Sequence, residues 1–216
     1  MSRPHTSDPS APARLVPALL RLAAALAIVV AVASQYTYSA LHTVVNPFSY
    51  FGYFTNQSNL FAAFVLGVTA VAALRRRPLR PGWGTLRGAA TVYMTVTFVV
   101  YNVLLAGLGS DRFTLQWSND IVHRVVPAYL ILDWLIFADR PRIRWSRLWL
   151  FLVYPILWCA ATLLRGFYID GFFAYPFLDP ASAGSAIPLY ILGIAVFIAL
   201  VGAGVIAATR WRSAPS

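Results

Sequence analysis

Six apolar stretches dominate this chain, and each is long enough to cross a membrane as an α-helix. A helix needs about 20 apolar residues to span a hydrocarbon core of roughly 30 Å. Together the stretches take up most of the 216 residues, so little room is left for a separate soluble domain. We therefore expect an all-α, polytopic integral membrane protein with one six-helix transmembrane domain over residues 14–209. The stretches are Arg14–Tyr38, Tyr53–Leu74, Gly88–Leu108, Asn119–Ala138, Leu148–Leu164 and Ala186–Thr209.

The positions of the basic residues predict how these helices are oriented. All seventeen basic residues are arginine, and thirteen of them lie before or at the start of the first stretch, after the last, or in the second and fourth connections. Only Arg112 and Arg165 lie in connections on the opposite side, while Arg21 and Arg124 fall within stretches. Positively charged connections are retained in the cytoplasm, so we expect both termini to be cytoplasmic. The net charge of +10 then reflects topology rather than nucleic-acid binding, because the arginines are split over short segments without an aromatic platform.

Both ends of the chain differ in composition from the apolar stretches. Residues 1–13 are rich in Pro, Ser and Ala, and we expect a disordered cytoplasmic tail there and a second one at 210–216. Ala31-Val32-Ala33 resembles a signal-peptide cleavage site, so removal of the first apolar stretch as a signal peptide is an open alternative. We favour an uncleaved helix, because the arginine pattern supports six spans. The arginine-only, alanine-rich composition is typical of a GC-rich bacterium, so we expect the bacterial plasma membrane.

Several chemistries are excluded by residue counts. Cys159 is the only cysteine, which rules out an intrachain disulfide and a thiolate metal site. Three scattered histidines do not supply a bis-histidine haem or a histidine-rich di-iron site. The absence of lysine rules out a retinal Schiff base. We therefore expect neither a metal ion nor a cofactor.

His123 is the only histidine within an apolar stretch. An ionisable side chain in a membrane span is a functional hypothesis by default, because burying it costs free energy. Helical spacing places Asn119 and Asp120 on the same face as His123, with Arg124 beside them. Two simpler interpretations stay open, since Asp120 suits a helix amino end and Arg124 suits the membrane interface.

Polar side chains of other stretches are expected at the same outer level. Thr55, Ser58 and Asn59 share one face at the start of the second stretch, and Asn102 lies near the outer end of the third. Arg165 ends the fifth stretch. The amino ends of three helices also face outward, and their partial positive charge favours a ligand carboxylate or an oxyanion. A structural role for Thr55 stays open, because threonines in membrane helices often bond to a neighbouring carbonyl.

Three short motifs resemble the androgen-induced membrane protein family. They are Tyr53-Phe54-Thr55-Asn56-Gln57, His123 four residues before Pro127, and Tyr175-Pro176-Phe177-Leu178. The resemblance covers about Phe51 to Leu178 and implies a six-helix fold. It also implies an intramembrane threonine hydrolase of fatty acid esters of hydroxy fatty acids, with Thr55 as nucleophile and His123 as general base. The polar residues after Thr55 and the charged pair beside His123 depart from the family pattern, which leaves the substrate open.

Two functions follow from these observations. The first is an intramembrane lipid ester hydrolase that uses Thr55 and His123 and draws a fatty-acyl ester from the outer leaflet. The alternative is a non-enzymatic lipid-binding or transport protein with an anion-recognising outer pocket. The expected partner is a membrane lipid in both cases, nucleic acid is not expected, and the oligomeric state is left open. The residues expected to bind or orient the ligand are Ser58, Asn59, Asn102, Asn119, Asp120, Arg124, Arg165 and Tyr175.

Overall fold

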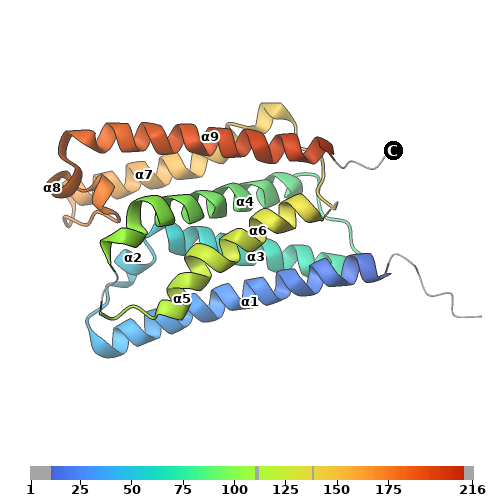
Figure 1. Cartoon of the computed structure of the whole chain (residues 1–216), viewed down its shortest axis with the longest axis horizontal. Helices are drawn as coiled ribbons and strands as arrows, with labels where there is room; N and C mark the ends of the chain where they lie inside the picture. The colour runs from blue at the N-terminus through green and yellow to red at the C-terminus, as the bar shows by residue number, and fades with distance from the viewer. Residues whose placement is uncertain (1–10, 110–111, 138, 212–216) are drawn as a thin grey trace, which may run out of the picture.

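Long antiparallel helices make up the chain in a computed structural model that describes residues 11–109, 112–137 and 139–211 (Figure 1). These ranges contain helices and no strand, which confirms the predicted all-α fold. The α-helices are α1 Ala11–His42, α2 Pro47–Tyr50, α3 Phe54–Leu74, α4 Trp83–Val100, α5 Gln116–Asp120, α6 Val126–Ile136, α7 Leu150–Tyr168, α8 Pro180–Ala183 and α9 Ile187–Trp211. The shorter π and 3₁₀ segments are η1 Tyr101–Leu105, η2 Ala106–Leu108, η3 Ile121–Val125, η4 Trp145–Arg147, η5 Pro176–Leu178 and η6 Gly184–Ala186.

Five helical segments within the described ranges are long and apolar enough to cross a membrane. They confirm that the protein carries membrane-type helices and correspond to five of the six predicted stretches. The remaining stretch is also helical, since α5, η3 and α6 follow one another without a break from Gln116 to Ile136. It carries three charged residues, Asp120, Arg124 and Asp133, which make it less apolar than the others. The five segments are Arg14–His42, Phe54–Leu74, Trp83–Leu108, Trp145–Tyr168 and Pro180–Trp211.

Helix α4 is the centre of the bundle. Twelve of its eighteen residues are buried, and it packs against α3, α6 and α9. One apolar cluster joins α4 to α1, α3 and α6, and a second joins it to α7 and α9. The start of α1 and the end of α9 lie at the same end of the bundle (Figure 1). The predicted tails 1–10 and 212–216 lie outside the described residues, while 11–13 and 210–211 belong to α1 and α9.

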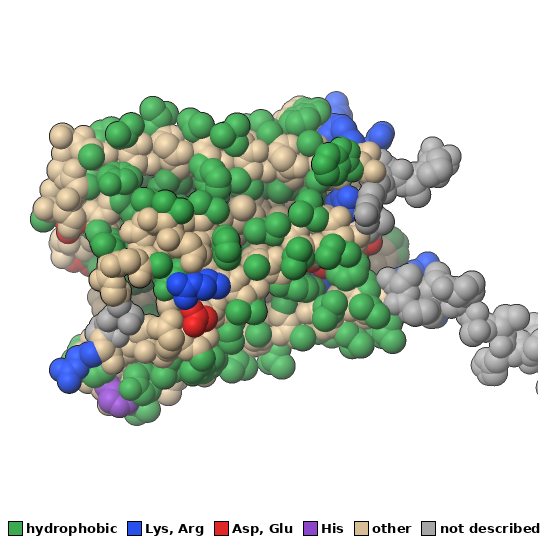
Figure 2. Space-filling model, in the orientation of Figure 1, with side chains coloured by type: hydrophobic (Ala, Val, Ile, Leu, Met, Phe, Trp, Pro, Cys, Tyr) green, Lys and Arg blue, Asp and Glu red, His purple; other side chains and the backbone are tan. Residues whose placement is uncertain are grey.

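Many apolar side chains are exposed on the outside of the bundle, and they are spread over the face shown in Figure 2. Helices α7 and α9 are the least buried of the long helices, and side chains such as Leu157, Leu164 and Leu200 are exposed. A soluble protein rarely exposes continuous apolar surface of this kind. The surface is the one that a lipid bilayer would cover, which is consistent with a membrane protein.

The start of α4 differs from the prediction. The sequence placed Arg87 in a connection, with the helix starting at Gly88, but α4 begins at Trp83 and buries the Arg87 side chain. Two contacts explain the longer helix. Arg87 finds aspartate partners inside the bundle, and Gly84 lies so close to Pro141 that an added Cβ would be 2.3 Å from the proline ring. The arginine therefore belongs to the packed bundle rather than to a cytoplasmic connection.

Candidate functional site

An apolar cavity of about 300 Å³ lies between the start of α3, the end of α4, and parts of α7 and α9. Most of its wall is aliphatic or aromatic, with side chains such as Val96, Leu163 and Ile198. Thr55 and Tyr175 bring hydroxyl groups to this wall. A cavity with mainly apolar walls and a few polar groups suits a lipid acyl chain whose polar end meets those hydroxyls.

Thr55 is the second residue of α3, and its side chain is buried. The Tyr175 hydroxyl lies 3.1 Å from both the Thr55 amide nitrogen and Thr55 Oγ1. Because an N–H group only donates, the Tyr175 oxygen accepts from the amide, and its own proton is then free to go to Thr55 Oγ1. The amide belongs to the first turn of α3, where N–H groups lack partners within the helix and favour negative charge. Thr55 thus combines a hydroxyl, an amide donor and a phenol at one point of the cavity wall.

Ser58 and Asn59 fix the backbone of this turn. The Ser58 hydroxyl donates to the Thr55 carbonyl at 3.1 Å and also contacts the Thr97 hydroxyl. The Asn59 amide donates to the carbonyls of Thr55 and Val122, at 2.9 and 3.0 Å. Asn59 therefore ties the start of α3 to the segment that carries His123. Its Oδ1 is the one buried side-chain atom that has no hydrogen-bond partner within the described residues.

His123 lies in η3, beside the other π-helical segment η1. Its Nδ1 is 3.0 Å from the Asn119 carbonyl, and its ring stacks on Tyr101 with centroids 4.0 Å apart. The Asn119 amide donates to the Tyr101 hydroxyl at 2.5 Å. Because a carbonyl only accepts, the neutral imidazole carries its proton on Nδ1 and keeps a lone pair on Nε2, as a general base requires. π-Helical turns are frequent at functional sites.

The charged residues near His123 form a partly exposed group. Arg124 pairs with Asp120 and donates from Nε to Asn102 Oδ1 at 3.1 Å. Its guanidinium also lies over the Tyr101 ring, 5.0 Å from the centroid. Asp120 neutralises Arg124, so this predicted binding residue brings no net positive charge to the site.

Arg165 lies away from the cavity wall. It binds Asp170, the Phe48 carbonyl and the Ser49 hydroxyl, and so fastens α2 to the end of α7. The hydrogen bond from Arg165 lowers the pKa of the exposed Asp170 carboxyl. A structural role at the end of α7 accounts for these contacts.

The predicted site residues thus fall into two neighbouring groups. The first surrounds Thr55 on the cavity, and the second surrounds His123. Tyr101 connects them, because it lines the cavity and stacks on His123, which is not among the lining residues. No hydrogen bond joins Thr55 to His123 in the part of the chain that the structure describes. The first group holds Thr55, Ser58, Asn59 and Tyr175, and the second holds Asn102, Asn119, Asp120, His123 and Arg124.

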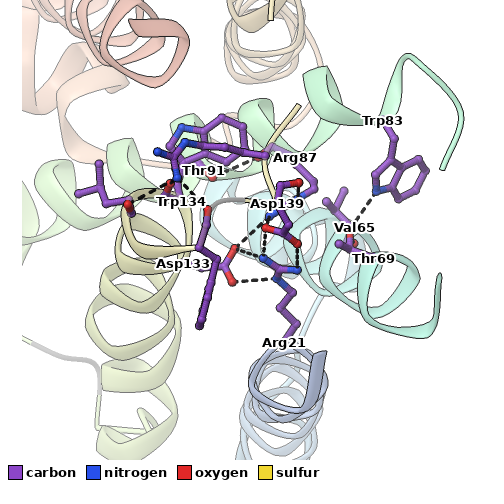
Figure 3. A network of polar contacts seen from close by, with 12 residues as sticks. Arg21, Val65, Thr69, Trp83, Arg87, Thr91, Asp133, Trp134 and Asp139 are labelled. Atoms are coloured by element: carbon purple, nitrogen blue, oxygen red, sulfur yellow. Dashed lines mark hydrogen bonds and ion pairs between the residues drawn. The ribbon is translucent and has the colours of Figure 1, made fainter. Parts of the chain in front are cut away.

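A cluster of two arginines and two aspartates at the opposite end of the bundle was missed by the sequence interpretation (Figure 3). Arg21 of α1 binds Asp133 of α6 at 2.8 Å and Asp139 at 2.5 Å. Arg87 of α4 reaches the same two carboxylates at 3.4 and 3.2 Å. The sequence did contain a signal for this cluster. Arg21 and Asp133 carry opposite charges in two different apolar stretches, and each lies near the arginine-rich end of its stretch. The four charges cancel, which makes their burial tolerable.

Asp139 is the member of this cluster that keeps contact with solvent, with 44% of its side chain exposed. Burial raises its pKa, but the hydrogen bonds and charges of Arg21 and Arg87 outweigh this effect and lower the pKa to about 2. A carboxyl with a depressed folded-state pKa contributes stability above its unfolded value of 3.8. That contribution is lost as the pH falls through about 2, so Asp139 stays ionised near neutral pH.

Comparison of the chain with models of known protein families, with curated proteins and with solved structures finds no match. Within the described ranges, no group of three or more His, Cys, Asp or Glu side chains is arranged to hold a metal ion. The cavity and the two groups of polar residues beside it are therefore the features that indicate a function.

Proposed function

We propose that the protein is an intramembrane hydrolase of fatty-acyl esters, with Thr55 as its nucleophile. The observation that carries the proposal is the buried Thr55 hydroxyl on the wall of an apolar cavity of about 300 Å³. The cavity offers room for an acyl chain, and the hydroxyls of Thr55 and Tyr175 lie where an ester group would meet the wall. The resemblance of the motifs around Thr55, His123 and Tyr175 to a family of threonine hydrolases supports the same assignment.

The reaction would follow the usual course of acyl transfer. Thr55 Oγ1 attacks the ester carbonyl carbon, the bond to the leaving alcohol breaks, and the acyl group stays on Thr55 until water releases it as a carboxylic acid. Negative charge develops on the carbonyl oxygen during both steps. The Thr55 amide at the start of α3 and the Tyr175 hydroxyl would stabilise it by exchanging their present hydrogen bonds, to the Tyr175 oxygen and to Thr55 Oγ1, for bonds to the oxyanion.

His123 is the proposed general base for this reaction. Its protonated Nδ1 faces the Asn119 carbonyl, so Nε2 has the lone pair that would take the Thr55 proton and return it to the leaving alcohol. Because the ring packs against Tyr101, the transfer requires a movement of Tyr101 or a bridging water molecule. Asn59 holds the start of α3 against the segment that carries His123, because its side-chain amide donates to a carbonyl of each.

Filling the cavity tests this function without touching Thr55. Ala195 of α9 lines the cavity, so Ala195→Phe should exclude a long acyl chain and raise KM for a long-chain ester at least about tenfold, given the transfer energy of each buried methylene. Hydrolysis of a chromogenic long-chain ester by purified protein in nanodiscs is the measurement. Ala207→Phe is the matched control, because Ala207 is an exposed residue of the same helix outside the cavity. Unchanged kinetics for Ala195→Phe, with the protein folded, would place the substrate elsewhere.

A second candidate function is acyl-chain binding without hydrolysis. The observation that favours it is the partner of Thr55, since its hydroxyl contacts a tyrosine and not a base. A binder would retain a labelled fatty acid or lipid in the cavity and release it unchanged. Ala195→Phe would lower retention in that case, while wild-type protein would show no ester turnover.

We further propose that the six helical segments all cross the membrane, with both termini in the cytoplasm. Support comes from the twelve arginines that remain on one side when the buried Arg87 is left out, and from the shared end of the bundle at which α1 starts and α9 ends. Reporter domains fused after Gly109 and after Gly184 should both report a position outside the cytoplasm. Fusions after Pro78 should report the cytoplasm and serve as the control. A cytoplasmic signal at Gly109 or Gly184 would contradict six spans in this orientation.

A further inference from the structure

A second hollow lies on the exposed face of α3 and is distinct from the cavity at Thr55. It has a volume of about 570 Å³. Three pairs of adjacent residues form it, and each pair lies about one helical turn after the previous one: Ala63 and Phe64, Gly67 and Val68, Val71 and Ala72. Residues at this spacing share a helix face, so the groove runs parallel to the α3 axis. From residue 63 to residue 75 it extends for about 18 Å at 1.5 Å per residue. That length matches about one leaflet, which is half of a core of roughly 30 Å.

Arginines close one end of the groove. Arg75 and Arg77 line it together with Pro78 and Leu79, at the turn that ends α3. The intervening Arg76 has a φ of 53°, in the left-handed region, and the Arg77 amide donates back to the Ala72 carbonyl at 2.9 Å. The chain thus folds back over the helix end, and both Arg75 and Arg77 stay at the groove.

The counter-charge for these arginines does not come from the described chain. Neither Arg75 nor Arg77 forms a side-chain hydrogen bond or ion pair with a described residue, and every described aspartate is engaged elsewhere. An anion from outside the described residues is therefore the available partner. Asp120 binds Arg124, Asp133 and Asp139 bind Arg21 and Arg87, Asp170 binds Arg165, and Asp179 caps α8.

We propose that this groove binds an anionic phospholipid from the leaflet at the arginine-rich end of the bundle. One acyl chain lies along α3 over Gly67, and the phosphate lies at Arg75 and Arg77, whose guanidinium groups match phosphate oxygens in geometry and charge. Trp83 supports the groove through Phe64, because its Nε1 donates to Thr69 at 2.9 Å (Figure 3), and its ring centroid lies 6.0 Å from that of Phe64. The bound lipid is a fixed partner here and not the substrate of the cavity.

Lipid retention by purified protein tests the charged end of the groove. Native mass spectrometry of detergent-solubilised protein, titrated with phosphatidylglycerol, should give about tenfold weaker binding for Arg75→Gln/Arg77→Gln than for wild type, since each arginine near an anionic surface strengthens binding several-fold. The matched control is Arg142→Gln/Arg144→Gln, which removes the same charge from exposed arginines of the same end outside the groove. An equal loss in the control would reduce the effect to general charge attraction and overturn the site.

The apolar part of the groove is tested separately. A Cβ added at Gly67 meets nothing within 4 Å, so Gly67→Phe should fold normally and fill the groove. We expect it to weaken phosphatidylglycerol binding about as much as the arginine pair does, and we expect glycerol phosphate without acyl chains not to compete. Phosphatidylcholine should bind more weakly than phosphatidylglycerol to the wild type. Equal binding of the two lipids, competition by glycerol phosphate, or unchanged binding to Gly67→Phe would each contradict a phospholipid site.

Discussion

Thr55→Ala is expected to abolish ester hydrolysis, with a loss of about 10⁴-fold or more in kcat/KM. The substitution removes the hydroxyl that would attack the ester, whereas the apolar wall of the cavity stays in place. The folded protein should survive the change, because the lost contact with Tyr175 is worth only about 1 kcal/mol. Purified wild-type and variant proteins should be compared on a fatty-acyl ester and by thermal unfolding.

Two further variants separate a nucleophile from a structural threonine. Thr95→Ala is the control, since the Thr95 hydroxyl donates to a carbonyl of its own helix and to no other described residue, and it should leave hydrolysis nearly unchanged. His123→Ala should reduce hydrolysis about as much as Thr55→Ala, and the double variant should be little worse than either single one. If Thr55→Ala stayed active while His123→Ala were inactive, a histidine-activated water would replace Thr55. If both variants stayed active, neither residue would be catalytic and the hydrolytic site would lie elsewhere, whereas the acyl-binding function would hold only if the wild type turned over no ester.

Arg21→Met should produce the largest loss of stability. Arg21 is fully buried and makes four hydrogen bonds to Asp133 and Asp139, so its removal leaves Arg87 alone with two carboxylates. Removing one partner of a buried ion pair costs about 3–5 kcal/mol, because the remaining charge is uncompensated. For a chain of this length that corresponds to a fall of roughly 10 °C in the unfolding temperature.

The charge balance of the cluster provides the control for this loss. Arg14→Met makes the same change on the same helix at an exposed position and should shift the unfolding temperature little. Arg21→Met/Asp139→Asn restores a one-to-one pair of Arg87 with Asp133 and should recover part of the stability. A double variant with a lower unfolding temperature than Arg21→Met would contradict the charge-balance explanation.

The helical fold was predictable because it follows from the length of the apolar stretches. The prediction was wrong at the start of α4, where Arg87 was taken for a residue of a connection. The sequence around a single arginine at the end of an apolar stretch does not distinguish an arginine at the membrane interface from one buried inside the bundle. Its aspartate partners, Asp133 and Asp139, are more than 40 residues away in the chain, and only the packing of α1, α4 and α6 brings them together.

The candidate site was predictable only in part. Helical spacing placed Thr55, Ser58 and Asn59 on one face, and their hydrogen bonds agree with this arrangement. The contact between Thr55 and Tyr175 spans 120 residues, so spacing did not indicate it. The cavity wall from α7 and α9 left no signal either, since its aliphatic side chains resemble those that face lipid. The placement of Tyr101 between the two groups likewise depends on the contact of η1 with η3.

The most direct test of the central claim is identification of the residue that carries the covalent intermediate. Purified protein in nanodiscs would be treated with a fluorophosphonate probe that bears a long alkyl chain, digested, and analysed by peptide mass spectrometry. If Thr55 is the nucleophile, the adduct should be found on the peptide that contains Thr55 and should be missing from Thr55→Ala protein. An adduct on another residue, or wild-type hydrolysis of an ester without any adduct at Thr55, would contradict the assignment.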